Sequence, residues 1–365
     1  MIQDIVDGHP YVQVVAGTEG GCPLYRALWP LDIVNMMERG THFIRVPEPI
    51  LDGPVFLATK AIMVHAIPTD EIVKLLEPLA AMRDGYGFKL VLSFDDLPCE
   101  YHGQGRPEWH QAPVPKPENL VKAGRLVDTV LVSTEYLKGL VLDLCPEARV
   151  EVIENAIPRH MFSQERDEKK QAPQVPHVVA SGAPMHYSGT VDDWSSGAWA
   201  EWICRKVSNN DIKFTVMGGH VPKYLEPVAD RIRVVQWTPT INYPGLLGRL
   251  KPDIVIAPLI DLEYNRCKSD LRFIEAAAVN SAFMGSWFPH GAYEKVPELS
   301  RVPLGATVEE LERIYQGILG NYQNLVSEGW KRLDDGRIME SENWIRRWLA
   351  ALTGGTRRFV LEDFR

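Results

Sequence analysis

The sequence has few cysteines, and they lie far apart. The five residues are odd in number and never form a C-x-x-C pair: Cys22, Cys99, Cys145, Cys204 and Cys267. Disulfide frameworks and structural zinc sites need paired or clustered thiols, so neither is predicted. We expect reduced and partly buried thiols.

Long apolar runs are also missing. No stretch reaches the roughly 18 uninterrupted apolar residues that a membrane-spanning helix needs. The first residues, MIQDIVDGHP, carry neither the basic end nor the apolar stretch of a signal peptide. We therefore expect a soluble, cytoplasmic protein with no stable membrane insertion, as a monomer or a weak dimer.

Two common nucleotide-binding motifs are absent. The glycine-rich segment 17–23 (GTEGGCP) is not G-x-G-x-x-G, and no acidic residue ends the next expected strand, His42–Val46. The pattern G-x-x-x-x-G-K-[ST] occurs nowhere in the chain. These absences disfavour a Rossmann dehydrogenase and a phosphate-loop hydrolase. The net charge of −9 argues against a general nucleic-acid binder, although it leaves room for a local basic groove.

Short β-branched runs alternate with helical patterns along the chain, as in a parallel sheet flanked by helices. The length of 365 residues is about twice that of a typical domain. We therefore predict an α/β fold of two doubly wound, Rossmann-like lobes facing each other across a cleft. The expected strands are Tyr11–Ala16, His42–Val46, Ala61–His65, Lys89–Phe94, Thr129–Ser133 and Val150–Ile153, then His177–Ser181, Lys213–Met217, Arg231–Val235, Asp253–Ala257 and Ala282–Gly285.

A polar segment separates the two expected lobes. Residues 163–176 (SQERDEKKQAPQVP) are rich in charge and proline and have no apolar periodicity, which is typical of a linker. We place the N-terminal lobe at residues 1–165, the linker at 166–176 and the second lobe at 177–338.

Two helices near the end of the chain have clear patterns. Residues 307–329 predict one long helix that opens with the capping-box pair Thr307 and Glu310. Residues 339–365 form a C-terminal helix and tail, and the apolar side of the helix predicts that it crosses back to pack on the first lobe.

Ligands bind at the carboxyl ends of parallel strands, so we look for candidate site residues directly after the expected strands. Asp95 and Asp96 end one strand and could accept hydrogen bonds from hydroxyls or cap the loop. Adjacent side chains of an extended segment point to opposite faces, so we expect one of the two to face the site. His65 ends the preceding strand and is a weaker candidate, because such histidines are often structural.

In the second lobe, Lys268 and Ser269 lie at an expected helix N-terminus, where ammonium, hydroxyl and amide groups can bind a diphosphate. Arg272 lies one turn further along the same face. Glu275 follows about two turns after Lys268 and could accept from two ribose hydroxyls. The small-residue turn at Gly182 also suits a phosphate.

These motifs together resemble one group of enzymes. The segments are Gly20-Gly21, Tyr25-Arg26, Phe94-Asp95-Asp96, VSTEYL at 132–137, VIENAI at 152–157, Gly182 to His186, Trp237 to Tyr243-Pro244, and Asn265 to Lys268-Ser269-Asp270 and Glu275. They are similar to glycosyltransferases of the GT-B fold, in the group-one, family-four-like branch of bacterial and phage type. The likeness covers roughly residues 10 to 290.

The resemblance implies transfer of a hexosyl or pentosyl group from a nucleoside diphosphate sugar, with a UDP-sugar the first choice, to an acceptor hydroxyl. It implies no cofactor, no metal and retention of the anomeric configuration. Lys268 and Ser269 would hold the diphosphate, Glu275 the ribose, and the backbone near Trp237 and Thr238 the base. The other implied site residues are Gly20, Gly21, Gly182, Arg266 and Arg272 for the donor, Asp95, Asp96 and His186 for catalysis, and Tyr25, Arg26, His65, Arg106 and Trp109 for the acceptor.

The sequence departs from that pattern at particular positions. Cys267 replaces the first acid of E-x7-E, eight residues before Glu275. The usual basic pair after the first strand of the second lobe is replaced around His186, which shifts charge neutralisation to Lys268, Arg266 or Arg272. Asn280 replaces a glycine, which is mild because asparagine tolerates the left-handed conformation.

The acceptor stays open between two classes. One is a sugar or lipid-linked glycan. The other is a hydroxymethylated pyrimidine base in DNA. A local basic rim for it could come from Arg106, Trp109 and His110, and from four arginines near the C-terminus: Arg346, Arg347, Arg357 and Arg358. A two-lobed ligand-binding protein is the non-enzyme alternative.

Overall fold

The computed structural model describes residues 11–17, 21–37, 42–104, 115–162, 164–167, 169–187 and 197–353, without the side chains of Pro184 and Met185. The chain divides into two compact units. Unit 1 comprises Met1–Tyr101, Val114–Glu154 and Met339–Arg365, and unit 2 comprises His102–Pro113 and Asn155–Ile338.

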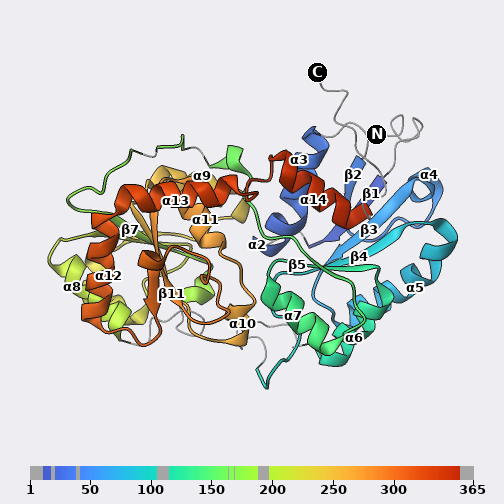
Figure 1. The fold of residues 1–365 in the computed structure, drawn as a ribbon, viewed down its shortest axis with the longest axis horizontal. Coiled ribbons are helices and arrows are strands. Elements are labelled where there is room, and N and C mark those ends of the chain that lie inside the picture. Colours follow the sequence, from blue (N-terminus) through green and yellow to red (C-terminus); the bar gives the residue numbers. More distant parts are fainter. Residues whose placement is uncertain are drawn as a thin grey trace. The chain divides into compact units, whose positions relative to one another are not determined.

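Unit 1 is built on a parallel six-stranded sheet with the order β2-β1-β3-β4-β5-β6. The chain steps one way from β1 to β2 and the other way from β3 to β6, so right-handed crossovers put helices on opposite faces. Figure 1 shows α3 and α14 on one side and α5, α6 and α7 on the other. The strands are β1 (Tyr11–Ala16), β2 (His42–Val46), β3 (Thr59–His65), β4 (Lys89–Ser93), β5 (Thr129–Val132) and β6 (Val150–Val152). The helices are α2 (Gly21–Pro23), η1 (Leu24–Leu28), α3 (Trp29–Met37), α4 (Gly53–Leu57), α5 (Asp70–Tyr86), α6 (Pro117–Leu126), α7 (Glu135–Leu144) and α14 (Glu342–Thr353).

Unit 2 has a second parallel six-stranded sheet, with the order β12-β11-β10-β7-β8-β9. Its strands are β7 (His177–Ser181), β8 (Lys213–Met217), β9 (Arg233–Val235), β10 (Ile254–Ala257), β11 (Ala282–Trp287) and β12 (Arg301–Pro303). Its α-helices are α8 (Ala198–Ser208), α9 (Tyr243–Leu250), α10 (Glu263–Arg266), α11 (Leu271–Ala278), α12 (Val308–Gly320) and α13 (Tyr322–Asp334). Its short 3-10 segments are η2 (Arg159–Met161), η3 (Pro184–Tyr187), η4 (Lys223–Arg231), η5 (Thr240–Asn242) and η6 (Glu298–Ser300).

The predicted α/β class with two doubly wound sheets is confirmed. The central strands explain why, because they are buried on both faces and therefore rich in apolar residues. All four residues of β10 are at most 1% exposed, and so are Ala61 to Val64 in β3. In each sheet the strand order reverses once, at β1/β3 and at β7/β10, and ligands of such sheets bind at this point.

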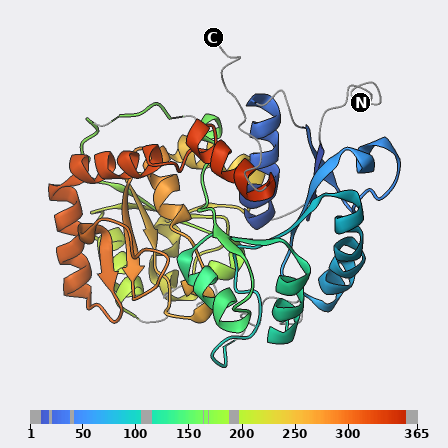
Figure 2. The ribbon, with the colours of Figure 1, turned by 45° about the vertical axis from the view of Figure 1, so that its right-hand side comes forward.

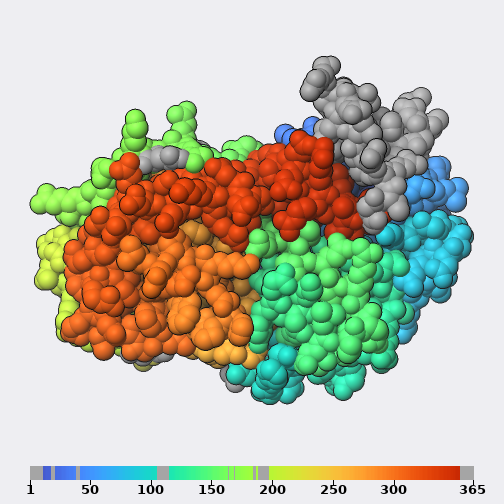
Figure 3. Space-filling view, viewed as in Figure 1, coloured from blue at the N-terminus to red at the C-terminus, as the bar shows by residue number. Residues whose placement is uncertain are grey.

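The single helix expected over residues 307–329 is wrong, because the chain forms two helices there. The capping box is present, with the Thr307 hydroxyl accepting from the Glu310 amide at 3.2 Å. Asn321 then leaves helical geometry at φ −120° and ψ 20°, and its side chain donates to the carbonyl of Gly317. The helices α12 and α13 therefore run in different directions (Figures 1 and 2). Atoms of this orange-red part of the chain form part of the surface of unit 2 in the space-filling view (Figure 3).

The segment interpreted as a linker, 166–176, is held by unit 2, which begins earlier at Asn155. Asn280 accepts from the Asp167 amide at 2.8 Å and from Trp330 Nε1 at 2.9 Å. Its φ of 56° is the left-handed conformation expected of it. Lys170 forms an ion pair with Asp253 at 3.2 Å.

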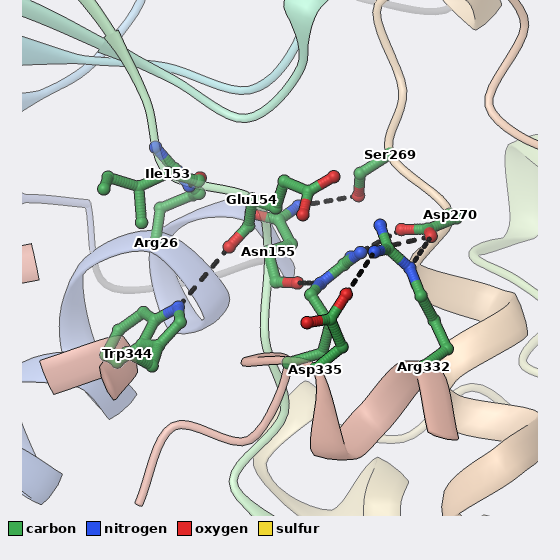
Figure 4. A network of polar contacts seen from close by, with 10 residues as sticks. Arg26, Ile153, Glu154, Asn155, Ser269, Asp270, Arg332, Asp335 and Trp344 are labelled. Carbon is green, nitrogen blue, oxygen red and sulfur yellow. Dashed lines mark hydrogen bonds and ion pairs between the residues drawn. The ribbon is translucent and has the colours of Figure 1, made fainter. Parts of the chain in front are cut away.

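The C-terminal helix α14 belongs to unit 1 and contacts β3, β4 and β5. Its apolar side is buried, and Trp348 packs against Phe43 with ring centroids 5.3 Å apart. Trp344 donates to the carbonyl of Glu154 at 3.5 Å (Figure 4). In the described part of the chain, no helix combines the length and the apolar character that crossing a bilayer requires.

Candidate functional site

In unit 1, the two adjacent carboxylates after β4 meet the thiol of Cys22, which lies in the short helix α2. Cys22 donates to Asp96 Oδ2 at 3.4 Å, and ligand atoms of Cys22, Asp95 and Asp96 all lie within 4.8 Å of one another. Carboxylate oxygens of both Asp95 and Asp96 therefore lie near Cys22, although the alternation of an extended segment would point them to opposite faces. The chain leaves the strand at Ser93 and bends at Asp96, so the alternation of extended residues no longer applies.

The same carboxylates set the charge state of this thiol. Burial first, and then the charges of Asp95 and Asp96, raise the pKa of Cys22 well above its usual value. The thiol therefore keeps its proton at neutral pH and acts as a donor. Sequence reasoning assigned Cys22 no role in the site, although its position soon after β1, at the reversal of strand order, could have indicated one.

Arg26 and His65 lie around the same carboxylates. Arg26 is 5% exposed and donates to the carbonyl of Ile153 (Figure 4). Burial lowers the pKa of Arg26, and the charge of Asp95 partly opposes this. Burial and the charge of Arg26 lower the pKa of His65 to about 3, so its imidazole is neutral at physiological pH. His65 Nδ1 lies 3.4 Å from Ser93 Oγ.

The other unit 1 candidates fall into two groups. Tyr25 packs its ring edge-on against Trp29, with centroids 4.5 Å apart, and is 4% exposed. Gly21 begins α2, and a methyl group placed there would meet no described atom within 4 Å. Gly20, Arg106 and Trp109 lie outside the described residues, as do His110, Arg357 and Arg358.

The cluster of Cys22, Asp95 and Asp96 is where unit 1 could hold a cation. Two carboxylates and a thiolate are a possible ligand set. However, the thiol would have to lose a proton that its surroundings retain, and Arg26 already supplies positive charge to Asp95. The cluster therefore suits hydrogen bonding to hydroxyl groups better than metal binding.

In unit 2, Gly182 follows β7 and lets two side chains approach the end of the sheet. A Cβ atom at this position would lie 2.8 Å from Arg272 Nη2 and 3.0 Å from His186 Cβ. The arginine contact is with the mobile end of a side chain and the histidine contact is tight, so a larger residue here would require both neighbours to shift. Arg272 and His186 both lie close to Gly182.

Glu275 is buried beside a tyrosine that the sequence assignment left out. Tyr243, the first residue of α9, donates to Glu275 Oε2 at 2.9 Å, and its oxygen lies 3.1 Å from Ser181 Oγ at the end of β7. Glu275 is 4% exposed. Burial first, and then the charge of Glu275, raise the pKa of Tyr243 well above its usual value. The phenol therefore stays protonated.

Lys268 and Ser269 precede Asp270, the N-cap residue of α11, so the helix begins after them and not at Lys268. Lys268 Nζ lies 4.7 Å from the centre of the Tyr264 ring. Ser269 Oγ accepts from Asn155 Nδ2 at 2.9 Å, and the next residue, Asp270, is paired with Arg332 (Figure 4). The loop that presents Lys268 and Ser269 is thus fixed from within unit 2.

Arg266 differs from the expectation. Its guanidinium binds both oxygens of Asp261, at 2.7 and 2.9 Å, and lies 3.3 Å from Glu263. These two carboxylates balance its charge, so we assign Arg266 to holding the loop rather than to phosphate neutralisation. Trp237 and Thr238 follow β9, and Trp237 is 53% exposed.

Comparison with known proteins gives structural matches only. No family model matches the chain, and no curated protein matches its sequence. The HepE protein of Anabaena, solved in complex with UDP, matches with a TM-score of 0.61 at 11% identity, covering 95% of this chain and 100% of HepE. Sucrose-phosphate synthase of Thermosynechococcus elongatus matches with a TM-score of 0.55 at 13% identity, covering 95% and 96%. A Rickettsia africae glycosyltransferase matches with a TM-score of 0.57 at 12% identity, covering 96% and 100%. The chain has the GT-B fold that these proteins share.

Proposed function

We propose that the protein is a glycosyltransferase that moves a sugar from a nucleoside diphosphate sugar to an acceptor hydroxyl. The observation that carries the proposal is the polar cluster of unit 2 at the reversal of strand order. There the buried carboxylate of Glu275 lies on the helix whose N-terminus is preceded by Lys268 and Ser269. This places a hydroxyl acceptor and phosphate-binding groups on one short element, as a nucleotide requires.

The donor roles follow from this arrangement. Lys268, Ser269 and the free amides of α11 would bind the diphosphate, with Arg272 and His186 at Gly182 adding charge and hydrogen bonds. Glu275 would accept from the ribose hydroxyls. Trp237 and Thr238 would border the base. HepE was also solved with UDP-glucose, which supports a UDP-sugar as the donor.

Unit 1 would bind the acceptor through its carboxylates. Asp95 or Asp96 would accept a hydrogen bond from the acceptor hydroxyl, and neutral His65 and cationic Arg26 would orient that carboxylate. Stabilising the departing diphosphate in unit 2 lowers the barrier to an oxocarbenium-like centre. We propose activity without a divalent cation, because Lys268 and Arg272 supply positive charge. We also propose retention of the anomeric configuration, as the sequence resemblance implies.

We further propose that the acceptor is a glycan and that the protein acts in the cytoplasm as a monomer or weak dimer. The five cysteines are all free in the structure, which suits a reducing compartment.

The test is release of nucleoside diphosphate from a panel of nucleotide sugars, with chelator present and with glycan or hydroxymethylated DNA as acceptor. We expect UDP release, and a loss of at least about tenfold in Lys268→Ala, because a charge-assisted phosphate contact is removed. Lys213→Ala is the matched control, since Lys213 is exposed at the start of β8.

Binding of a nucleotide sugar without turnover would favour the two-lobed binding protein instead. Full activity of Lys268→Ala, or complete loss of activity with chelator, would contradict the roles proposed here.

A further inference from the structure

We infer that Tyr243 is a positioning residue that orients the carboxylate of Glu275 toward the ribose, and so sets the preference for ribonucleotides over 2′-deoxyribonucleotides. This inference rests on the proposed function, in which Glu275 accepts from the ribose hydroxyls. It adds a residue from a different helix, which has no role in the donor site described above.

Three elements meet at the Tyr243 oxygen. Ser181 ends β7, Tyr243 begins α9, and Glu275 lies in the middle of α11. The Tyr243 oxygen is 2.9 Å from Glu275 Oε2 and 3.1 Å from Ser181 Oγ. Ser181 and Glu275 are 3% and 4% exposed, so water cannot readily replace either contact.

Counting protons fixes the direction of these hydrogen bonds. A phenol has one proton and a carboxylate has none, so the Tyr243 proton points to Glu275. The Tyr243 oxygen then accepts from the Ser181 hydroxyl. The chain of donation runs from Ser181 through Tyr243 to Glu275 and ends on one carboxylate oxygen.

A hydrogen bond to one oxygen fixes the rotation of the carboxylate. The terminal torsion of a glutamate is broad, so an unrestrained carboxylate samples many orientations. Binding two neighbouring hydroxyls needs one orientation. Tyr243 is itself well placed to impose it, because Pro244 follows at the first turn of α9 and restricts the backbone there.

The experiment measures the dissociation constants of UDP and 2′-deoxy-UDP by calorimetry, for the wild-type protein and for Y243F. We expect Y243F to weaken UDP binding about tenfold and 2′-deoxy-UDP binding less than about twofold, because the lost contact acts only through a ribose hydroxyl. E275Q should remove the discrimination, and S181A should reduce it less than Y243F does. Y224F is the matched control, because Tyr224 is 45% exposed in the same unit, and it should leave both constants unchanged.

The outcomes separate this inference from the proposed function. Two results would overturn the inference alone. In one, Y243F weakens the binding of UDP and of 2′-deoxy-UDP equally. In the other, Y243F and S181A keep the wild-type preference for UDP over 2′-deoxy-UDP while E275Q abolishes it. A wild-type protein that binds UDP no better than 2′-deoxy-UDP, or binds neither, would overturn the ribose role of Glu275 and the inference with it.

Discussion

His65 is buried at the end of β3 beside a permanently charged guanidinium, and this surrounding determines how its protonation affects stability. Burial and Arg26 lower the pKa of His65 from its usual 6.5 to about 3. Between these values the unfolded chain takes up a proton that the folded chain does not. Stability is therefore unaffected above about pH 6.5 and is lost as the pH falls toward 3.

We predict that this one group lowers the free energy of unfolding by about 2 kcal/mol between pH 7 and pH 5. Urea titrations at several pH values would measure it. His65→Gln should show a flatter pH dependence than the wild-type protein, and His160→Gln, at an exposed position, should keep the wild-type slope. Equal slopes in His65→Gln and wild type would contradict the prediction.

At this scale the sequence indicates residue types better than contacts. The pair Asp95-Asp96 could be found because it follows a strand. The meeting of both carboxylates with Cys22 could not, because it depends on a bend at Asp96 and on a partner 74 positions away in the chain. Tyr243 was missed for the same reason, since an aromatic residue at a helix start gives no signal that its hydroxyl reaches Glu275.

At the scale of elements, the start of α11 depends on a buried ion pair. Arg337 is 1% exposed and binds Asp270, with one of its nitrogens 3.1 Å from Oδ2, and Arg332 lies 3.4 Å from the same oxygen. Burial alone would raise the pKa of Asp270, but the charges of Arg337 and Arg332 outweigh it and lower that pKa. This stabilisation is therefore complete above about pH 4 and is lost as the pH falls further.

We predict that Asp270→Asn lowers the free energy of unfolding by about 3 kcal/mol, because it leaves a buried guanidinium without its counter-charge. It should also weaken UDP binding, since the residue adjoins Ser269. Chemical denaturation and calorimetry would measure the two effects. Asp335→Asn is the control. Asp335 is 84% exposed, and its ion pair with Arg332 is long, at 3.9 Å, so the substitution should change the free energy of unfolding by less than about 1 kcal/mol. A similar small change in both variants would show that Arg337 is accommodated without Asp270.

Element prediction worked where a local signal exists. Every strand except the short edge strand β12 follows from the β-branched runs, and the start of α12 follows from the Thr307 and Glu310 pair. The break at Asn321 was missed, because the apolar stripe continues across it and only the backbone geometry shows the turn. The polar segment 166–176 gives no sign that Asn280 and Asp253 bind two of its own residues, Asp167 and Lys170.

At the scale of the whole molecule, charge bears on the acceptor. The chain has 48 acidic and 39 basic residues, a net charge of −9. Binding to duplex DNA relies on cations that neutralise phosphates, so its affinity falls steeply with salt when many contacts are made. On α14, Arg346 is paired with Glu342 and Arg347 lies 3.4 Å from the carbonyl of Val152. Glu342 offsets the charge of Arg346, whereas the carbonyl that Arg347 contacts leaves the charge of Arg347 in place.

We therefore predict no measurable binding of a plain 20-base-pair duplex at about 150 mM salt, and transfer to glycans in preference to hydroxymethylated DNA. Fluorescence anisotropy between about 50 and 200 mM salt would measure binding, with the logarithm of affinity falling by fewer than about two units per unit of log salt. Radiolabelled sugar transfer to both acceptors would be compared in the same buffer. The contrary outcome is a fall in the logarithm of affinity of about six or more per unit of log salt, together with sugar transfer to the modified duplex. It would show that a confined basic region binds DNA despite the net negative charge of the chain, and the acceptor would then be DNA.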